Sequence, residues 1–129
     1  MQNDIKSNYA LNESLAAASV APSTVNGASV DHANGSGVSF LVSVGTVGAS
    51  ATIDAKTQYS DDNSIWTDYP AADEAGNDDA IVQITVAGSE QLNVPNPRGR
   101  YSRVVVTVGT AASVVGVTSV LGPLRHIAA

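Results

Sequence analysis

Cysteine is absent from this chain of 129 residues, and aromatic and charged residues are scarce. Without cysteine there are no disulfide bonds, no thiolate metal ligands and no cysteine nucleophile. Aromatic residues make up only 5% of the sequence, so we expect a core of small side chains, chiefly Val and Ala. No apolar run approaches the roughly 20 residues of a transmembrane helix, and we therefore expect no membrane-spanning segment.

Charged residues account for 14% of the sequence, against about 25% in an average soluble domain. Such a surface must be covered by Ser, Thr, Asn and Gly. It is compatible with extensive contacts to other protein subunits, although extracellular domains have similar surfaces. The formal net charge of -6 argues against binding to nucleic acid or to an anionic membrane, because both require a basic surface.

The N-terminal residues 1–14 show no strand periodicity, and we predict that they form a polar arm. The following Leu15-Ala16-Ala17-Ala18 has the small apolar character of a signal peptide. However, Asp4 and Glu13 stand where the basic region of a signal peptide would be. Residues 15–129 are sufficient for one domain with its own core, so we predict a single domain there.

The segment Ala49–Tyr59 alternates between apolar side chains at nearly every odd position and polar side chains at the even ones. A period of two predicts a strand with one buried and one solvated face. Similar segments recur about every 8 to 12 residues, the spacing typical of sandwiches and barrels. The predicted strands are Ala17–Ala21, Ala28–His32, Val38–Gly45, Ala49–Tyr59, Ile65–Tyr69, Ala80–Ala87, Gln91–Val94, Tyr101–Val108 and Ser113–Leu121. We therefore predict an all-β fold, an antiparallel β-sandwich that is jelly-roll-like and has about eight strands.

Turn residues separate these segments. Asn26-Gly27 and the run Asn34 to Gly37 tolerate positive φ. The short loops at Gly45–Gly48 and Gly109–Ala111 predict hairpins between the strands that they join. Pro95-Asn96-Pro97 is expected to be a loop, because proline is excluded from central strands.

Several strands carry apolar residues on both faces. Val38, Phe40, Val42 and Val44 are expected to point into the core, as are Val104, Val106 and Val108. The additional apolar residues, which we place near the opposite face, are Leu41, Val105, Val115 and Val117. A strand that is apolar on both sides lies either in a sheet covered on both faces or at a subunit interface, and we favour the interface.

Two acidic segments contain carboxylates of the kind that bind hard cations. The run Asp61-Asp62-Asn63 fails the EF-hand pattern, because the sixth position is Trp66 rather than glycine, and it predicts a hairpin turn. The residues Asp73, Glu74, Asp78 and Asp79 have enough carboxylates to hold a hard cation, but a solvated loop is the more common role. We predict no metal site and no cofactor, and leave open whether the loop 73–79 binds a cation.

Catalytic patterns are weak. His32 and His126 are the only histidines, and no G-x-S-x-G sequence is present. Gly35-Ser36-Gly37 has the wrong spacing for a nucleophile elbow. We therefore predict no catalytic residue and no enzyme activity.

Arg98, Arg100 and Arg103 place three of the six basic residues close together. They indicate either a solvated loop or an interface clamp, because arginine forms bidentate pairs with carboxylates of the same chain or of a partner. Trp66, the only tryptophan, is expected to cap the core beside Tyr59 or Tyr69.

The run from Val38 to Pro70 resembles small structural proteins from the head modules of tailed bacteriophages. The shared features are a Val-rich strand, a Gly-Thr turn, a long alternating strand and a hairpin, here Gln58–Asp68. The entry Gly99–Arg103 and the ending Gly122-Pro123-Leu124-Arg125 are similar too. The resemblance covers about residues 15–125 and rests on structural rather than catalytic motifs.

This resemblance implies a capsid decoration (cement) protein, which stabilises the head by clamping neighbouring capsid subunits. Its implied partners are the major capsid protein and further copies of itself, as a homotrimer. Its implied location is the capsid surface of the virion, after synthesis in the host cytoplasm.

Two alternatives stay open. One is a carbohydrate- or receptor-binding module of a phage tail or fibre, with Trp66, Tyr59, Tyr69 and the acidic loop as its site. The other is a different head–tail or tail-tube component, for which a ring-shaped oligomer would be diagnostic.

Overall fold

The computed structural model describes residues 9–33, 35–70 and 81–124, and the regular structure of these residues is all β-strand. The strands are β1 (Ala10–Val20), β2 (Ser23–Asn26), β3 (Val30–Asp31), β4 (Gly35–Thr46), β5 (Thr52–Ser60), β6 (Thr67–Asp68), β7 (Ile81–Ile84), β8 (Gly88–Val94), β9 (Tyr101–Gly109) and β10 (Ser113–Leu124). Within these ranges there is no helix long and apolar enough to cross a membrane.

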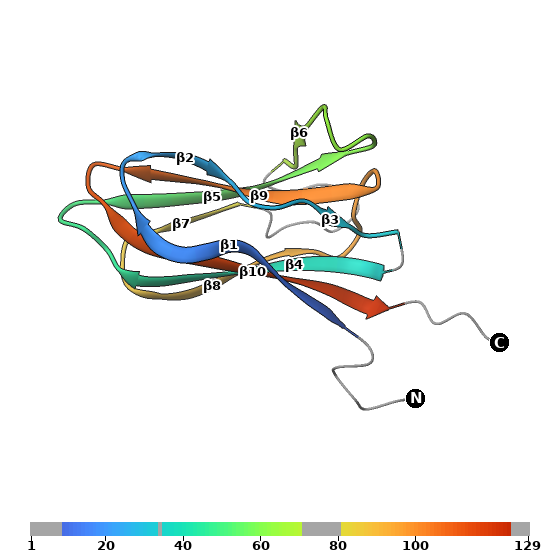
Figure 1. Cartoon of the computed structure of the whole chain (residues 1–129), viewed down its shortest axis with the longest axis horizontal. Coiled ribbons are helices and arrows are strands. Elements are labelled where there is room, and N and C mark those ends of the chain that lie inside the picture. Colours follow the sequence, from blue (N-terminus) through green and yellow to red (C-terminus); the bar gives the residue numbers. More distant parts are fainter. Residues whose placement is uncertain (1–8, 34, 71–80, 125–129) are drawn as a thin grey trace.

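The strands form two antiparallel sheets that lie against each other (Figure 1). Sheet A has the order β1-β10-β4-β8. Sheet B has the order β2-β9-β5-β6, with β3 also paired to β9 and β7 to β5. The predicted all-β sandwich is therefore confirmed.

Four strand pairs, β1–β10, β2–β9, β4–β8 and β5–β7, are nested in the sequence. They are arranged as if one long hairpin had been rolled up, which brings β4 beside β10 and β5 beside β9. This is a jelly roll. The eight strands of the nested pairs match the predicted number, and the additional β3 and β6 have only two residues each.

The core lies between the sheets and consists mainly of valine. Val38, Phe40, Val42 and Val44 of β4 are buried in it, and so are Val104, Val106 and Val108 of β9, as the alternation predicted. Burying each such side chain stabilises the fold by about 1.5–3 kcal/mol relative to an exposed one. Because the side chains are small, many alternating positions on both sheets are needed to fill this core.

Two residues predicted for the opposite face, Val115 and Val117 of β10, belong to this core instead, with exposed fractions of 0% and 2%. The prediction was wrong because Val114 and Val115 are both apolar, so the sequence does not reveal which of them points inward. A register shift between these two residues sets the alternation, and Val114 remains partly exposed.

Val105 lies on the outward side of β9, as predicted, but it is only 4% exposed. In the sheet it lies between Asn26 of β2 and Lys56 of β5. Val105 is therefore covered within the chain. It offers no surface to a neighbouring subunit, which corrects its assignment as an interface residue.

The predicted N-terminal arm is too long. β1 begins at Ala10, and residues Ala10–Glu13 already pair with β10. This strand is difficult to predict from the sequence because its pairing with β10 changes register twice. The shifts lie between Glu13 and Leu15 and between Leu15 and Ala18. Each shift interrupts the period of two on which the prediction depended. Residues 1–8 lie outside the described part of the chain.

The two short loops predicted as hairpins cross between the sheets instead. β4 and β5, on either side of Gly45–Gly48, belong to sheets A and B, and so do β10 and β9, on either side of Gly109–Ala111. Loop length alone does not distinguish a hairpin from a crossover of this kind. The hairpin predicted at Gln58–Asp68 is confirmed, because Gln58 pairs with Asp68 and Tyr59 with Thr67.

Candidate functional site

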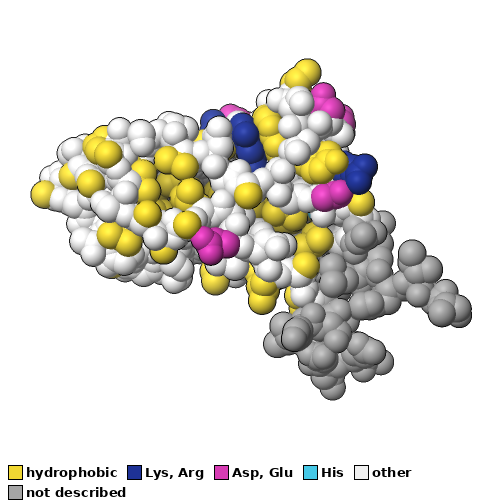
Figure 2. Space-filling model, viewed as in Figure 1, with side chains coloured by type: hydrophobic (Ala, Val, Ile, Leu, Met, Phe, Trp, Pro, Cys, Tyr) yellow, Lys and Arg dark blue, Asp and Glu magenta, His cyan; other side chains and the backbone are white. Residues whose placement is uncertain are grey.

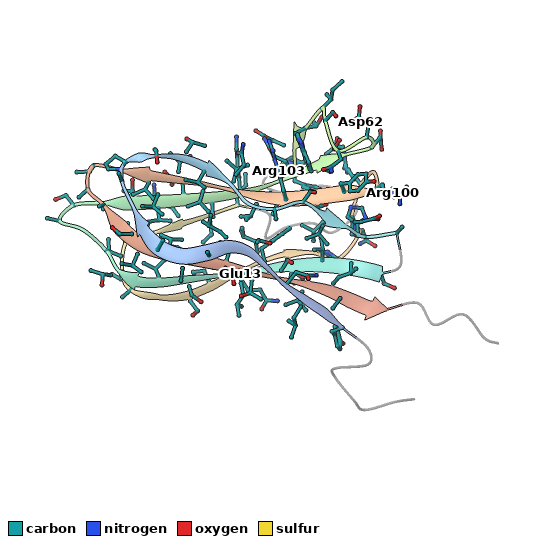
Figure 3. The ribbon with its side chains drawn as sticks, in the orientation of Figure 1. Glu13, Asp62, Arg100 and Arg103 are labelled. Carbon is teal, nitrogen blue, oxygen red and sulfur yellow. The ribbon has the colours of Figure 1, made fainter. Side chains whose placement is uncertain are left out.

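The three arginines of the predicted clamp lie on two elements, and Figure 3 shows Arg100 and Arg103 apart from each other. Arg98 and Arg100 belong to the loop before β9, whereas Arg103 is on β9 itself. The guanidinium of Arg100 donates to Asp31 of β3, with Nη2 2.8 Å and Nε 3.1 Å from Oδ2. The bond from Arg100 is the main reason that the pKa of Asp31 lies below its usual value. Arg100 therefore has an acidic partner on its own chain.

Arg103 belongs to a polar network on the outer side of sheet B. Its Nε donates to Gln58 Oε1 at 2.8 Å, and its guanidinium carbon lies 4.3 Å from the centre of the Trp66 ring. Gln58 Nε2 and Lys56 Nζ both donate to Asp68, at 2.7 and 3.0 Å. The charged groups of this network are thus partnered within the chain, and a contact between Arg103 and a partner protein stays a prediction.

Tyr59, Tyr69 and Trp66 do not form a sugar-stacking platform. Tyr69 is only 1% exposed, and its hydroxyl accepts a hydrogen bond from Arg98 N at 2.8 Å. Burial raises the pKa of Tyr69. The rings of Tyr59 and Tyr69 pair at 4.8 Å, while Trp66 contacts Arg103 and is absent from the hydrophobic core cluster. The prediction that Trp66 caps the core beside a tyrosine was therefore wrong.

The acidic hairpin forms the predicted turn. Asp62 Oδ1 accepts hydrogen bonds from Ser64 N at 2.9 Å, Ile65 N at 3.0 Å and Ser60 Oγ at 2.9 Å. These donors lower the pKa of Asp62. Asn63 takes the positive φ of 62° that such a turn requires. Asp62 thus organises its own backbone.

Two predicted features fall on residues outside the described ranges: the acidic loop Asp73–Asp79 and His126. A cation at the loop therefore stays an open prediction. Among the residues that are described, no three His, Cys, Asp or Glu side chains form a cluster suited to a metal ion.

His32 is buried at the end of β3, with an exposed fraction of 6%. Its Nε2 atom is buried and has no hydrogen-bond partner among the described residues. Burial lowers the pKa of His32. The residue is therefore a neutral part of the interior at neutral pH.

The outer side of sheet A carries almost no charge. Glu13 and Glu90 are the only charged residues in β1, β4, β8 and β10, whereas sheet B carries Asp31, Asp54, Lys56, Asp68 and Arg103. Figure 2 shows the contrast from one side, because the Lys and Arg side chains in view lie in the upper part, where sheet B runs, and the lower part shows a single acidic patch.

We call the outward side chains of β4, β8 and β10 the neutral face. Its members alternate with the core residues of these strands and are Gly37, Ser39, Leu41, Ser43 and Gly45, then Ser89, Gln91 and Asn93, and finally Val114, Gly116, Thr118, Val120 and Gly122. Leu41, predicted as an interface residue, lies near its centre and is 41% exposed. Leu11 of β1, paired with Val120, and Val114 are exposed by 62% and 36%.

The neutral face contains an open hollow of about 340 Å³ at one end. Its floor is the pair Gly37–Gly122, which are direct neighbours on β4 and β10. Its walls are formed by Tyr9, Val120, Asn93 and Pro95. The sequence pattern does not reveal this hollow, although the alternation of Gly, Ser and Leu from Gly37 to Gly45 indicates that the face is uncharged.

No family model matches the chain, and no curated protein matches it. Among solved structures, one described as "Crystal structure of PirA" aligns with 95% of this chain and 96% of that one, at 12% sequence identity and a TM-score of 0.44. A likeness of this degree bears on neither fold nor function.

Proposed function

We propose that the protein is a structural component of a tailed-phage head, a capsid decoration (cement) protein that binds the outer capsid surface as a homotrimer. The proposal rests on the resemblance of residues 15–125 to head proteins and, above all, on the neutral face. This face combines exposed Leu41 and Val114 with small uncharged neighbours, and exposed Leu11 of β1 lies beside it, paired with Val120.

A neutral face suits permanent docking because little charge has to be removed from water when it is covered. Covering the exposed apolar side chains contributes about 25 cal/mol per Å² of apolar area. The contact of one copy can be modest, because copies joined in a trimer and arranged on a regular lattice bind with multiplied avidity. The jelly roll supplies a rigid frame, so little ordering is needed on binding.

The alternative of a carbohydrate module built on Trp66, Tyr59 and Tyr69 has less support. A sugar site built on these three residues needs an exposed aromatic ring face for stacking. Tyr69 is buried, and the Trp66 ring is in contact with Arg103. We therefore retain the structural role as the main proposal.

The test uses heads of the phage that carries the gene, prepared without this protein. The purified wild-type chain should bind such heads saturably and raise the temperature at which they release DNA. Light scattering should give the mass of a trimer in solution. A monomer that leaves the heads unchanged would contradict the proposal, and a larger ring would favour a head–tail component.

A matched pair of variants tests the docking face. Leu41→Asp places a charge on the neutral face, and we expect it to reduce head binding by at least about tenfold, because an unpaired charge would be buried. Ile81→Asp is the control. Ile81 is similarly exposed, at 49% against 41% for Leu41, but it lies on sheet B. Equal head binding by the two variants would exclude the neutral face as the docking surface.

A further inference from the structure

Two glycines that lie opposite each other line the hollow in the neutral face. Gly122 of β10 pairs with Gly37 of β4, and neither residue carries a side chain. The Cβ position of Gly37 lies against the backbone of Pro95, 3.3 Å from its carbonyl oxygen, so Pro95 borders the hollow closely at this point. The next pair along these strands, Val120 and Ser39, carries side chains again and closes the hollow on that side. Tyr9, just before β1, and Pro95, just after β8, stand at opposite walls.

A short chain of hydrogen bonds fixes the polar groups of this hollow. Gln91 Nε2 donates to Ser39 Oγ at 3.1 Å, and Ser39 Oγ donates to Asn93 Oδ1 at 2.8 Å. This arrangement uses the carbonyl oxygen of Asn93 and leaves its amide group as a donor. It uses one hydrogen of the Gln91 amide and leaves the Gln91 carbonyl oxygen as an acceptor. Neither remaining group has a partner among the described residues.

The hollow therefore presents an oriented donor and an oriented acceptor on neighbouring outward positions of β8. No charged residue lines it. Its other walls are apolar or aromatic, from Val120, Pro95 and Tyr9. A ligand that fits must offer closely spaced hydroxyl groups, an apolar face and no net charge.

We propose that this hollow binds a neutral saccharide. The sugar hydroxyls accept from the Asn93 amide and donate to the Gln91 carbonyl oxygen, while the C–H face of the ring lies against Tyr9 or Val120. The hollow's volume of about 340 Å³ is near the lower end of the roughly 300–1,000 Å³ of ligand pockets, which limits the ligand to one or two sugar units. Because the hollow is open and its contacts are few, the dissociation constant is expected in the millimolar range.

This inference goes beyond the proposed function and does not depend on it, because the sugar binds to the free protein. Docking of the neutral face, to which the hollow belongs, would cover the site. It is tested on the free protein, without phage heads. Val114→Asp also places a charge on the neutral face, but Val114 does not line the hollow, so this variant should fail to bind heads and should still bind sugar. A loss of one activity therefore does not imply a loss of the other.

The experiment is an NMR titration of the full chain, labelled with ¹⁵N. The probes are glucose, galactose, mannose, N-acetylglucosamine, lactose and maltose, with sialic acid as an anionic counter-probe. We expect saturable shifts of the Asn93 and Gln91 side-chain amides and of the Gly37 and Gly122 backbone amides with at least one neutral sugar. Absence of these shifts for all neutral probes, or binding of sialic acid alone, would overturn the proposal.

The decisive variant is Asn93→Asp. It retains the oxygen that accepts from Ser39, but it replaces the donor amide by a carboxylate oxygen. We expect the affinity for the sugar to fall by at least about tenfold with the fold intact. Asn26→Asp makes the same chemical change on exposed β2 of sheet B and should bind sugar like the wild type. Unchanged affinity in Asn93→Asp would show that the hollow is not the binding site.

Discussion

Individual glycines in this protein have different physical roles. Gly37 and Gly122 line the hollow of sheet A, and Gly37 allows the backbone of Pro95 to come close to β4. Gly99 instead meets a backbone requirement, because its φ is +66° and a Cβ there would lie 2.7 Å from Ser60 O. The sequence alone does not distinguish these three glycines. Only the atoms around each one in the folded chain show which role it has.

Replacing Gly99 by alanine should destabilise the protein for two reasons. The left-handed φ is unfavourable for any L side chain, and the new methyl group would collide with the backbone of Ser60. Gly88→Ala is a matched comparison, because Gly88 also has a positive φ, +147°, but nothing lies within 4 Å of its Cβ position. We expect urea unfolding to show Gly99→Ala at least about 1 kcal/mol less stable than Gly88→Ala. Equal stabilities would show that the collision is relieved by movement.

His32 gives the stability of the protein a pH dependence. Burial lowers the pKa of folded His32 below its ordinary value of 6.5, so in acid the unfolded chain takes up a proton that the folded chain resists. The free energy of unfolding should therefore fall as the pH drops below about 6.5, by at most about 1.4 kcal/mol per pH unit. Nearby Asp31 has its pKa lowered by Arg100, so it titrates at a more acidic pH.

The check is urea unfolding at a series of pH values for the wild type and for His32→Gln. The variant keeps His126, so any contribution from that histidine is common to both curves. We expect the difference in slope between the two proteins to appear below about pH 6.5 and to vanish above it. Parallel curves over the whole range would contradict the assignment to His32.

At the scale of elements, β1 is the strand whose position was hardest to predict from the sequence. Its ladder with β10 is interrupted twice, and within the second interruption, between Leu15 and Ala18, Ala17 passes over Gly116. A Cβ at residue 116 would lie 3.0 Å from the Cβ and 3.1 Å from the Cα of Ala17, so β1 can lie this close to β10 only because residue 116 is glycine.

Substituting Gly116 by alanine should push β1 away from β10. We expect faster hydrogen exchange for the amides of β1 that pair with β10, while those of β9 in the other sheet keep their protection. Gly45→Ala is the control on the same face, because its new methyl group would meet nothing closer than Val114 Cγ1 at 3.5 Å. Uniform exchange changes in both sheets would indicate a global rather than a local effect.

At the scale of the whole molecule, the roll gives the two outer surfaces different characters. The outer side of sheet B carries a connected polar network. Lys56 and Gln58 both donate to Asp68, while Arg103 donates to Gln58 and lies over the Trp66 ring. The outer side of sheet A has small uncharged side chains and exposed leucines. This difference is the reason that both proposals concern sheet A: the head contact is centred on Leu41, and the hollow lies at one end of the same face.

The amino-acid sequence by itself determined the fold class, most of the core and the acidic turn. These depend on local rules, because alternation fixes which side of a strand is buried and Asp62 bonds to residues next to it. The sequence also indicated that Leu41 is exposed on a sheet face, since apolar residues lie on either side of it along β4.

Only the tertiary structure decided which sheet each strand joins, that β1 begins at Ala10, and that Val115 and Val117 point inward. These depend on pairings between residues far apart in the chain and on register shifts within them, which no local pattern encodes. The hollow at Gly37 and Gly122 is of the same kind, because two glycines 85 positions apart become a surface feature only when β4 and β10 lie side by side.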